Sequence, residues 1–222
     1  MTAPVTTDTD LDEVPATDDG GRRAGHRFGT LALAAAVVVG LLLGYAGGLL
    51  TPTFTRPGEH SVEAGFARDM TTHHAQAVEM GLLAFQQGQD SEVRQIGGDI
   101  ATGQQGEIGT MQTWLRLWKL GPTGDDPPMA WMSDGAGLVK EGLMPGMATP
   151  EEMKQLRATT GREFDLLFLR LMIQHHLGGV HMIQGVLDEG HDKDVLAVAQ
   201  TMKNTQQTDL ANLNAALKRL GG

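Results

Sequence analysis

Residues 66–80, with the sequence FARDMTTHHAQAVEM, return 102 positions later as residues 168–182, with the sequence FLRLMIQHHLGGVHM. Seven of the fifteen aligned positions are identical without a gap, and the shared pattern is M-x2-HH-x5-M. At about 100° per residue on a helix, the histidines and methionines of each copy fall on the same face as the apolar residues. The repeat therefore predicts two helices whose histidine and methionine side chains point into a common core.

This combination of side chains favours a soft metal ion. Cu(I) and Ag(I) accept both thioether sulfur and neutral imidazole, whereas Mg²⁺ and Ca²⁺ prefer oxygen ligands. The sequence has no cysteine, so neither a disulfide framework nor a thiolate site is possible. We predict a copper site, with Cu(I) favoured and Cu(II) bound by histidine alone as a variant. Its candidate ligands are Met70, His73, His74, Met80, Met172, His175, His176 and Met182.

Other interpretations of these residues stay open. The four histidines could instead form a hydrogen-bonded polar layer in the core, and methionine is also an ordinary filler of helical cores. Met144 and Met147, in an MPGM segment, are expected in a flexible surface loop, with auxiliary metal capture as a second role. Because no nucleophile, oxyanion donor or phosphate loop accompanies the histidines, we predict that the protein is not an enzyme. The alternative function is a metal-independent interaction scaffold of the cell envelope.

Three acidic residues are candidate hydrogen-bond partners of the histidines. Asp69 lies one helical turn before His73 and is a candidate hydrogen-bond acceptor for its ring. Glu107 and Asp209 occupy equivalent positions in the two repeats and either bond the histidines or are exposed. A di-iron or di-manganese carboxylate site, the usual competitor in a four-helix bundle, needs Glu-x-x-His motifs. The sequence contains none.

An apolar run near the N-terminus predicts a membrane anchor. Residues 31–50 are apolar or small and are numerous enough to cross a hydrocarbon layer about 30 Å thick. Three arginines precede the run, so the positive-inside rule leaves the N-terminus in the cytoplasm. We predict a disordered cytoplasmic tail over 1–29, a transmembrane helix or signal anchor over 30–51, a linker over 52–60 and an extracytoplasmic domain over 61–222. A cleaved signal peptide is the main alternative.

Local signals place the helices of that domain. Ser61 and Asp90 are plausible N-caps for helices over about 61–87 and 91–120, and Thr149-Pro150 starts a short helix to about Ala158. The second histidine helix begins near Arg162, and the last helix covers about 193–220. The repeats, about 61–120 and 161–220, are therefore two helical hairpins joined by a long crossover. We predict an all-α four-helix bundle preceded by one transmembrane helix.

The formal net charge of −10 argues against a nucleic-acid partner and is compatible with a bound cation. The expected partners are a metal ion and, through the N-terminal helix, a membrane. Whether the two histidine faces meet within one chain or across a homodimer is left open.

These motifs together resemble a known family. The doubled HH motif, the stretch from Gln104 to Leu115 and the MPGM segment are similar to the ferritin-like family catalogued as domain of unknown function 305, over about residues 60–220. The resemblance implies a ferritin-like four-helix fold, and export to or anchoring in the bacterial cytoplasmic membrane. Some members resemble periplasmic copper-binding proteins, which implies a ligand role for the histidines and methionines of both motifs. Met111 has Leu213 as its counterpart, so any ligand role of Met111 would be one-sided.

Overall fold

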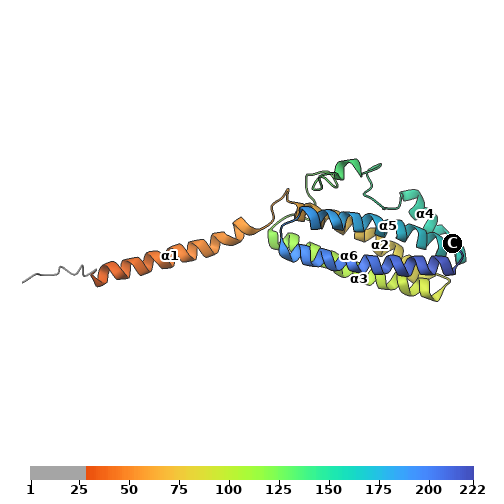
Figure 1. Cartoon of the computed structure of the whole chain (residues 1–222), viewed down its shortest axis with the longest axis horizontal. Coiled ribbons are helices and arrows are strands. Elements are labelled where there is room, and N and C mark those ends of the chain that lie inside the picture. The colour runs from red at the N-terminus through yellow and green to blue at the C-terminus, as the bar shows by residue number, and fades with distance from the viewer. Residues whose placement is uncertain (1–28) are drawn as a thin grey trace, which may run out of the picture. The chain divides into compact units, whose positions relative to one another are not determined.

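The computed structural model describes residues 29–222, without the side chains of residues 50–55. The tail predicted over 1–29 lies, apart from Gly29, outside the described residues. The chain divides into two compact units, Met1–Phe54 and Thr55–Gly222 (Figure 1). Each is described separately below.

Helix α1 (Thr30–Thr55) belongs to the N-terminal unit. Its segment Thr30–Leu49 has a mean hydropathy of 2.1 over 20 residues, and none of it is buried. Within residues 29–222 this is the one helix long and apolar enough to cross a membrane. The helical backbone continues to Thr55, so the linker predicted over 52–60 begins later than expected.

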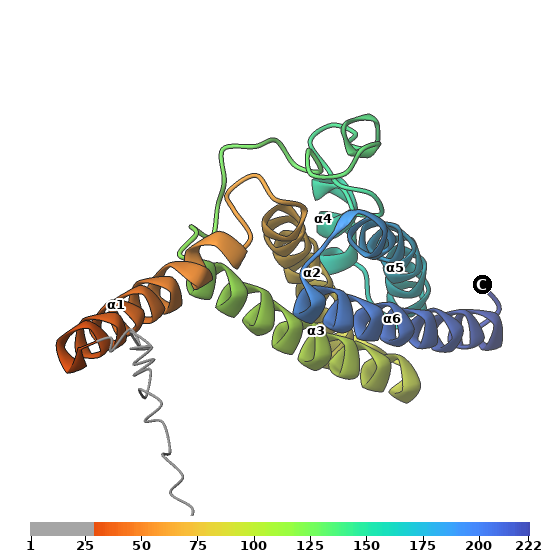
Figure 2. The same ribbon diagram turned by 60° about the vertical axis from the view of Figure 1, so that its left-hand side comes forward.

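The second unit is an all-α bundle, as the repeat predicts. Its four long helices are α2 (Val62–Gln87), α3 (Ser91–Trp118), α5 (Gly161–Glu189) and α6 (Lys193–Arg219). They lie side by side in Figures 1 and 2, and the crossover between α3 and α5 passes over α2 and α5. The crossover contains a 3₁₀ turn, η1 (Gly135–Gly137), and the short helix α4 (Pro150–Ala158).

The helix starts follow from local capping. The Ser61 hydroxyl accepts from Ala64 N (3.2 Å), and the Thr149 side chain forms a capping box with Glu152 at the start of α4. The Asp90 carboxylate accepts from the first backbone N–H groups of α3, and Asp192 does the same for α6. The caps predicted from the sequence at positions 61, 90 and 149 are confirmed.

Two buried carboxylates join the hairpins to each other. Glu63, at the start of α2, accepts from His191 N (2.6 Å) and Asp192 N (3.0 Å), in the turn between α5 and α6. Asp165, at the equivalent position of α5, accepts from Gln89 N (3.0 Å) and Asp90 N (2.9 Å) between α2 and α3. A carboxylate near the start of each helix, α2 or α5, thus binds the connection between the two helices of the other hairpin. The helices α2 and α5 therefore run antiparallel.

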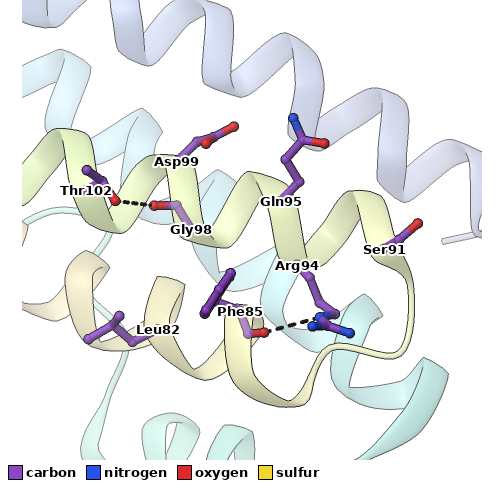
Figure 3. Close-up of a pocket in the computed structure, with 8 residues that line it drawn as sticks. All are labelled: Leu82, Phe85, Ser91, Arg94, Gln95, Gly98, Asp99 and Thr102. Carbon is purple, nitrogen blue, oxygen red and sulfur yellow. Dashed lines mark hydrogen bonds between the residues drawn. The ribbon is translucent and has the colours of Figure 1, made fainter.

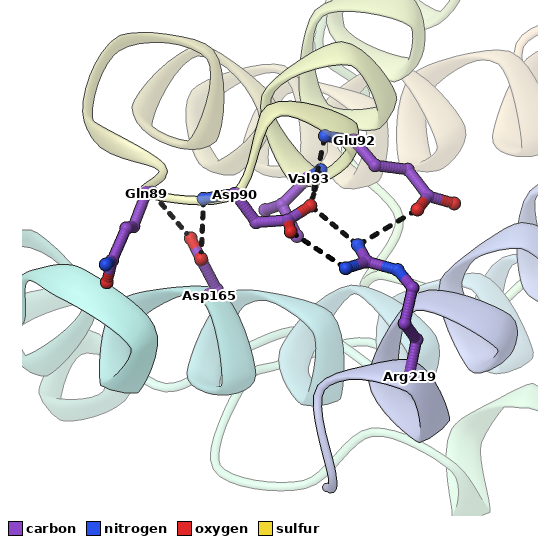
Figure 4. A network of polar contacts seen from close by, with 6 residues as sticks. All are labelled: Gln89, Asp90, Glu92, Val93, Asp165 and Arg219. Atoms are coloured by element: carbon purple, nitrogen blue, oxygen red, sulfur yellow. Dashed lines mark hydrogen bonds and ion pairs between the residues drawn. The ribbon is translucent and has the colours of Figure 1, made fainter.

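The Asp165 contact extends into an ion-pair network (Figure 4). The Asp90 carboxylate also accepts from the Arg219 guanidinium, at 2.9 and 2.6 Å, near the end of α6. Arg219 reaches Glu92 as well, at 2.9 Å. This end of the bundle is therefore held by residues from α3, α5 and α6 together.

Candidate metal centre

Four buried imidazoles meet in the middle of the bundle. The ring centroids of His73 on α2 and His175 on α5 lie 3.8 Å apart, with the planes tilted by 35°. Within each adjacent pair the ring centroids are 6.4 Å apart. All four rings are buried, none more than 1% exposed. The two histidine faces therefore meet within one chain.

The outer histidine of each pair contacts a carboxylate from the neighbouring helix. His74 Nε2 lies 2.8 Å from Glu107 Oε2 on α3, and His176 Nε2 lies 3.2 Å from Asp209 Oδ2 on α6. The two acids are about one-fifth exposed, 21% and 22%, so each links a buried ring to the surface. Of the two roles that the sequence left open, Glu107 and Asp209 thus take the hydrogen-bonding one.

Three ring nitrogens of this layer are buried without a partner. His73 Nε2 lies 3.0 Å from Pro145 O, and since a carbonyl only accepts, the proton is on Nε2 and Nδ1 keeps its lone pair. The same argument, with Glu107 as acceptor, leaves a lone pair on Nδ1 of His74. These two Nδ1 atoms and Nε2 of His175 have no hydrogen-bond partner. Burying a polar atom without a hydrogen bond costs about 1–3 kcal/mol of folding free energy. A ligand that bound these nitrogens would remove this cost.

His176 differs from its counterpart His74. Its Nδ1 lies 3.1 Å from Met172 O, and its Nε2 lies 3.2 Å from Asp209 Oδ2. Both nitrogens therefore face oxygen acceptors. A neutral ring has a single N–H, so only one of these contacts is a hydrogen bond, and in either tautomer the lone pair of the other nitrogen points at an oxygen atom.

The four motif methionines are fully buried but do not gather at one point. Met70 and Met182 belong to one apolar cluster, and Met80 and Met172 to another. Because α2 and α5 are antiparallel, the first methionine of each motif lies beside the last methionine of the other. The single core of imidazoles and thioethers expected from the repeat is thus divided into two methionine clusters.

The MPGM segment is a loop, as expected, but it is partly buried and held to the bundle. Gln76 of α2 binds both backbone groups of Ala148, with Ala148 N to Oε1 at 2.7 Å and Nε2 to Ala148 O at 2.9 Å. Met144 is buried in the first cluster, and Met147 packs against it. Residues 143–148, here called the strap, therefore cover the histidine layer and accept a hydrogen bond from His73 through Pro145.

Two glycines allow this close approach. A Cβ on Gly178 would lie 1.9 Å from Pro145 O, and one on Gly146 would lie 2.3 Å from Gln174 O. Gly146 also has φ +79°, a conformation that side chains disfavour. Gln76 and Gly178 occupy equivalent positions of the repeat, so one copy holds the strap and the other makes room for it.

Asp69 does not orient His73, contrary to the expectation from its spacing. Its Oδ2 accepts from Met129 N at 2.7 Å and from Trp131 Nε1 at 2.8 Å. The reason is that the crossover brings two donors to this carboxylate. Asp69 fastens the first part of the crossover to α2.

Burial lowers the pKa of His73, His74 and His175, so these three rings are neutral at pH 7. Burial, together with the charge of a protonated His74, lowers the pKa of His73 to about 3. Burial likewise lowers the pKa of His74, where Glu107 partly opposes the effect, and it holds the pKa of His175 well below the usual range. Neutral imidazole is the form that binds metals.

Histidine and carboxylate groups alone do not form a ready metal cage. Across residues 29–222, no set of three or more histidine, aspartate or glutamate side chains is arranged to hold an ion. The sequence predicts thioether sulfur as the second kind of donor beside ring nitrogen. That donor set fits Cu(I) or Ag(I) better than a hard cation.

Two surface hollows of similar volume differ in their distance along the fold from the histidines. A groove of about 640 Å³ between the end of α2 and the start of α3 is lined by Leu82, Phe85, Arg94 and neighbouring polar residues (Figure 3). It contains neither histidine nor methionine. A second hollow, of about 650 Å³, is lined by strap residues that include Met144, Pro145 and Met147, so it borders the segment that contacts His73.

Comparison with known proteins agrees with this architecture. Residues 63–217 match the family model described as Domain of unknown function (DUF305). A crystal structure of a DUF305 protein from Streptomyces coelicolor is 39% identical, with a TM-score of 0.68, and the match covers 74% of this chain and 97% of that one. A DUF305 fragment from Deinococcus radiodurans is 27% identical, with a TM-score of 0.61 and coverages of 74% and 99%.

The protein CopM has a similar fold. Its Cu(I)-bound form is 20% identical, with a TM-score of 0.57 and coverages of 72% of this chain and 98% of that one. CopM has also been solved with Ag and with Cu(II) bound. At this identity the likeness concerns the fold alone. A search of curated protein sequences found no match.

Proposed function

Because the chain belongs to the DUF305 family, we propose that it is an extracytoplasmic copper-binding protein that buffers copper or passes it on. The proposed ligands are the histidines and methionines of the doubled motif: Met70, His73, His74, Met80, Met172, His175, His176 and Met182. Cu(I) is the favoured ion.

The observation that carries this proposal is the set of unpaired nitrogens in the core. Nδ1 of His73, Nδ1 of His74 and Nε2 of His175 are buried without a hydrogen-bond partner. The opposite nitrogens of His73 and His74 each contact an oxygen acceptor, and metal-binding histidines are usually oriented in this way. A polar layer built only for stability would pair these atoms.

The distribution of sulfur supports a soft ion. The cluster that contains Met70 and Met182 also holds five other buried methionines, Met111, Met129, Met132, Met144 and Met202. The second cluster holds three buried methionines in all. The first cluster therefore offers more thioether donors, including Met144 of the strap, while Met80 and Met172 would bind from the second. Among proteins of this fold, CopM has been solved with copper and with silver.

Helix α1 supports the location outside the cytoplasm. The apolar segment Thr30–Leu49 is long enough to span a membrane, and arginines precede it. We propose that α1 anchors the chain in the cytoplasmic membrane with residues 61–222 on the outer side.

Equilibrium dialysis against Cu(I) tests the ligands. Fragment 56–222 is suitable, because it contains all of the compact second unit except Thr55. We expect His73→Ala and His175→Ala to weaken binding at least about tenfold, a loss of roughly 1.4 kcal/mol. His181→Ala is the matched control, since His181 lies on α5 and is exposed. Equal affinity in all four proteins would refute the assigned ligands.

A metal-independent envelope scaffold remains the second candidate. The observation in its favour is that three hydrogen bonds already join the strap to His73 and Gln76. It predicts a melting temperature that does not respond to copper, whereas a ligand selective for the folded state must raise it.

A further inference from the structure

The helices α3 and α6 each bury one glutamine on an otherwise apolar stripe. Along these two helices, both fully described, Gln104 and Gln206 are the only buried polar residues, 4% and 2% exposed. The two positions are equivalent in the repeat. Neither side-chain oxygen has a hydrogen-bond partner. A leucine at either position would fill similar space without the free-energy cost of an unpaired buried oxygen, so the amides call for a ligand.

The two amides flank the histidine layer. A Cβ on Gly179, one turn beyond the histidine pair of α5, would lie 2.5 Å from Gln206 Oε1. Gln104 precedes Glu107, which contacts the histidine layer from α3, by three positions and so by about one turn. Each amide therefore lies about one helical turn from the buried imidazoles.

The unpaired atoms of this region are of one chemical kind. Among the described side chains, the buried nitrogen and oxygen atoms without a partner are ring nitrogens of His73, His74 and His175 and the oxygens of Gln104 and Gln206. Each of these atoms can offer a lone pair, so a cation can bind them directly. Nitrogen together with oxygen is the donor set that Cu(II) prefers, whereas thioether sulfur selects Cu(I).

Two carboxylates border the layer and would offset the charge of a divalent ion. Glu107 Oε2 lies 2.8 Å from His74 Nε2, and Asp209 Oδ2 lies 3.2 Å from His176 Nε2. A buried charge is costly unless an opposite charge lies near it. The surroundings of the imidazoles thus suit a doubly charged copper ion as well as a singly charged one.

We propose that Gln104 and Gln206 are oxygen ligands for Cu(II), so that the histidine layer also holds copper in its oxidised state. The inference rests on the copper binding proposed above and adds a second oxidation state to it. The methionine clusters remain the donors for Cu(I). The two amides therefore determine whether copper can stay bound when it is oxidised.

The test compares both oxidation states in the full chain, held in non-ionic detergent and carrying no histidine tag. Gln104→Leu and Gln206→Leu remove the amides at similar volume, and the exposed neighbours Gln105→Leu and Gln207→Leu are the matched controls. Chelator competition measures the affinity for Cu(II) in air and for Cu(I) without oxygen, and electron paramagnetic resonance reports the Cu(II) ligands. We expect each buried variant to weaken Cu(II) binding at least about tenfold and to change the spectrum, with Cu(I) affinity unchanged.

The metal-free variants separate a ligand role from a packing role. Leucine removes an unpaired buried oxygen, so the melting temperature without metal should stay the same or rise. A lower melting temperature with equal loss of both ions, or an unchanged Cu(II) spectrum in both variants, would show that the amides only pack and would overturn the inference. If Gln206→Leu does not fold, Gln206→Met, which replaces oxygen with sulfur, must show the same selective loss of Cu(II).

The unmodified chain separates this inference from the copper proposal itself. Binding of Cu(I) without binding of Cu(II) would overturn the role of the glutamines and leave the proposed function in place. Binding of neither ion would refute the proposed function, and the role of the glutamines with it.

Discussion

The rings of His73 and His175 lie 3.8 Å apart between centroids, in a part of the core from which solvent is excluded. Their positions are equivalent in the sequence repeat, and the antiparallel arrangement of α2 and α5 brings them together. A proton on either ring would place a buried charge against its neighbour. The stability of the metal-free protein should therefore depend on pH in a defined direction.

We expect the metal-free bundle to lose stability as the pH falls from about 6.5 towards 3. The unfolded chain takes up a proton at each histidine near pH 6.5, whereas the folded pKa of His73 is about 3. Between these values the unfolded state binds more protons, so the free energy of unfolding falls by up to about 1.4 kcal/mol per pH unit for this residue. Urea denaturation at several pH values measures the slope.

The contribution of His73 is isolated by His73→Gln. Carboxylates titrate in the same range in both proteins, so only the difference between the two slopes is informative. The variant should show a shallower decline, by up to one proton per molecule. Identical slopes would show that His73 does not stay neutral in the folded protein.

Two helical glycines should respond in opposite ways to alanine. Gly178→Ala places a Cβ 1.9 Å from Pro145 O, so the strap must move, and we expect a loss of about 1–3 kcal/mol. Gly103→Ala, on α3, meets nothing within 4 Å and should stabilise by up to about 1 kcal/mol. Thermal melting of both variants measures the effect, and a harmless Gly178→Ala would mean that the strap is loosely held.

The carboxylates that join the hairpins should contribute independently. Glu63→Gln and Asp165→Asn each replace a charged acceptor of two backbone N–H groups, and we expect a loss of about 1–3 kcal/mol for each. The two sites lie at opposite ends of α2, so the double variant should be additive within about 0.5 kcal/mol. Chemical denaturation measures this, with exposed Glu151→Gln as control. A strongly non-additive result would contradict two separate contacts.

His74 and His176 should differ as copper ligands despite their equivalence in the repeat. His74 already has a free Nδ1, whereas both nitrogens of His176 face oxygen acceptors. We expect His74→Ala to weaken Cu(I) binding more than His176→Ala does, as measured by competition with a Cu(I) chelator. The reverse order would show that copper binding rearranges the layer.

Much of the fold could be predicted because the repeat adds information to weak local signals. Five glycines in α3 argue against a helix, but their counterparts in α6 favour one, and both segments are helical. The repeat also predicts that both histidine pairs face a helical core, but it left open whether the pairs meet within one chain, which the structure shows. The acidic residues Glu63 and Asp165 are also equivalent by position, a signal that could have revealed their shared role.

The strap could not be predicted from its own residues. Its Pro and Gly content is typical of a surface loop, and what holds it is the side chain of Gln76 and the missing side chain of Gly178. Both are properties of distant helices. The separation of the methionines into two clusters likewise depends on the direction of α5 relative to α2, which no single motif indicates.

The most direct test of the copper proposal is the metal content of fragment 56–222 after Cu(I) loading and desalting, measured together with its melting temperature. The proposal predicts about one or more copper ions retained per chain and a melting temperature above that of the metal-free protein. Loss of the copper on desalting, with an unchanged melting temperature, would contradict it and leave the histidine layer as a structural feature of the core.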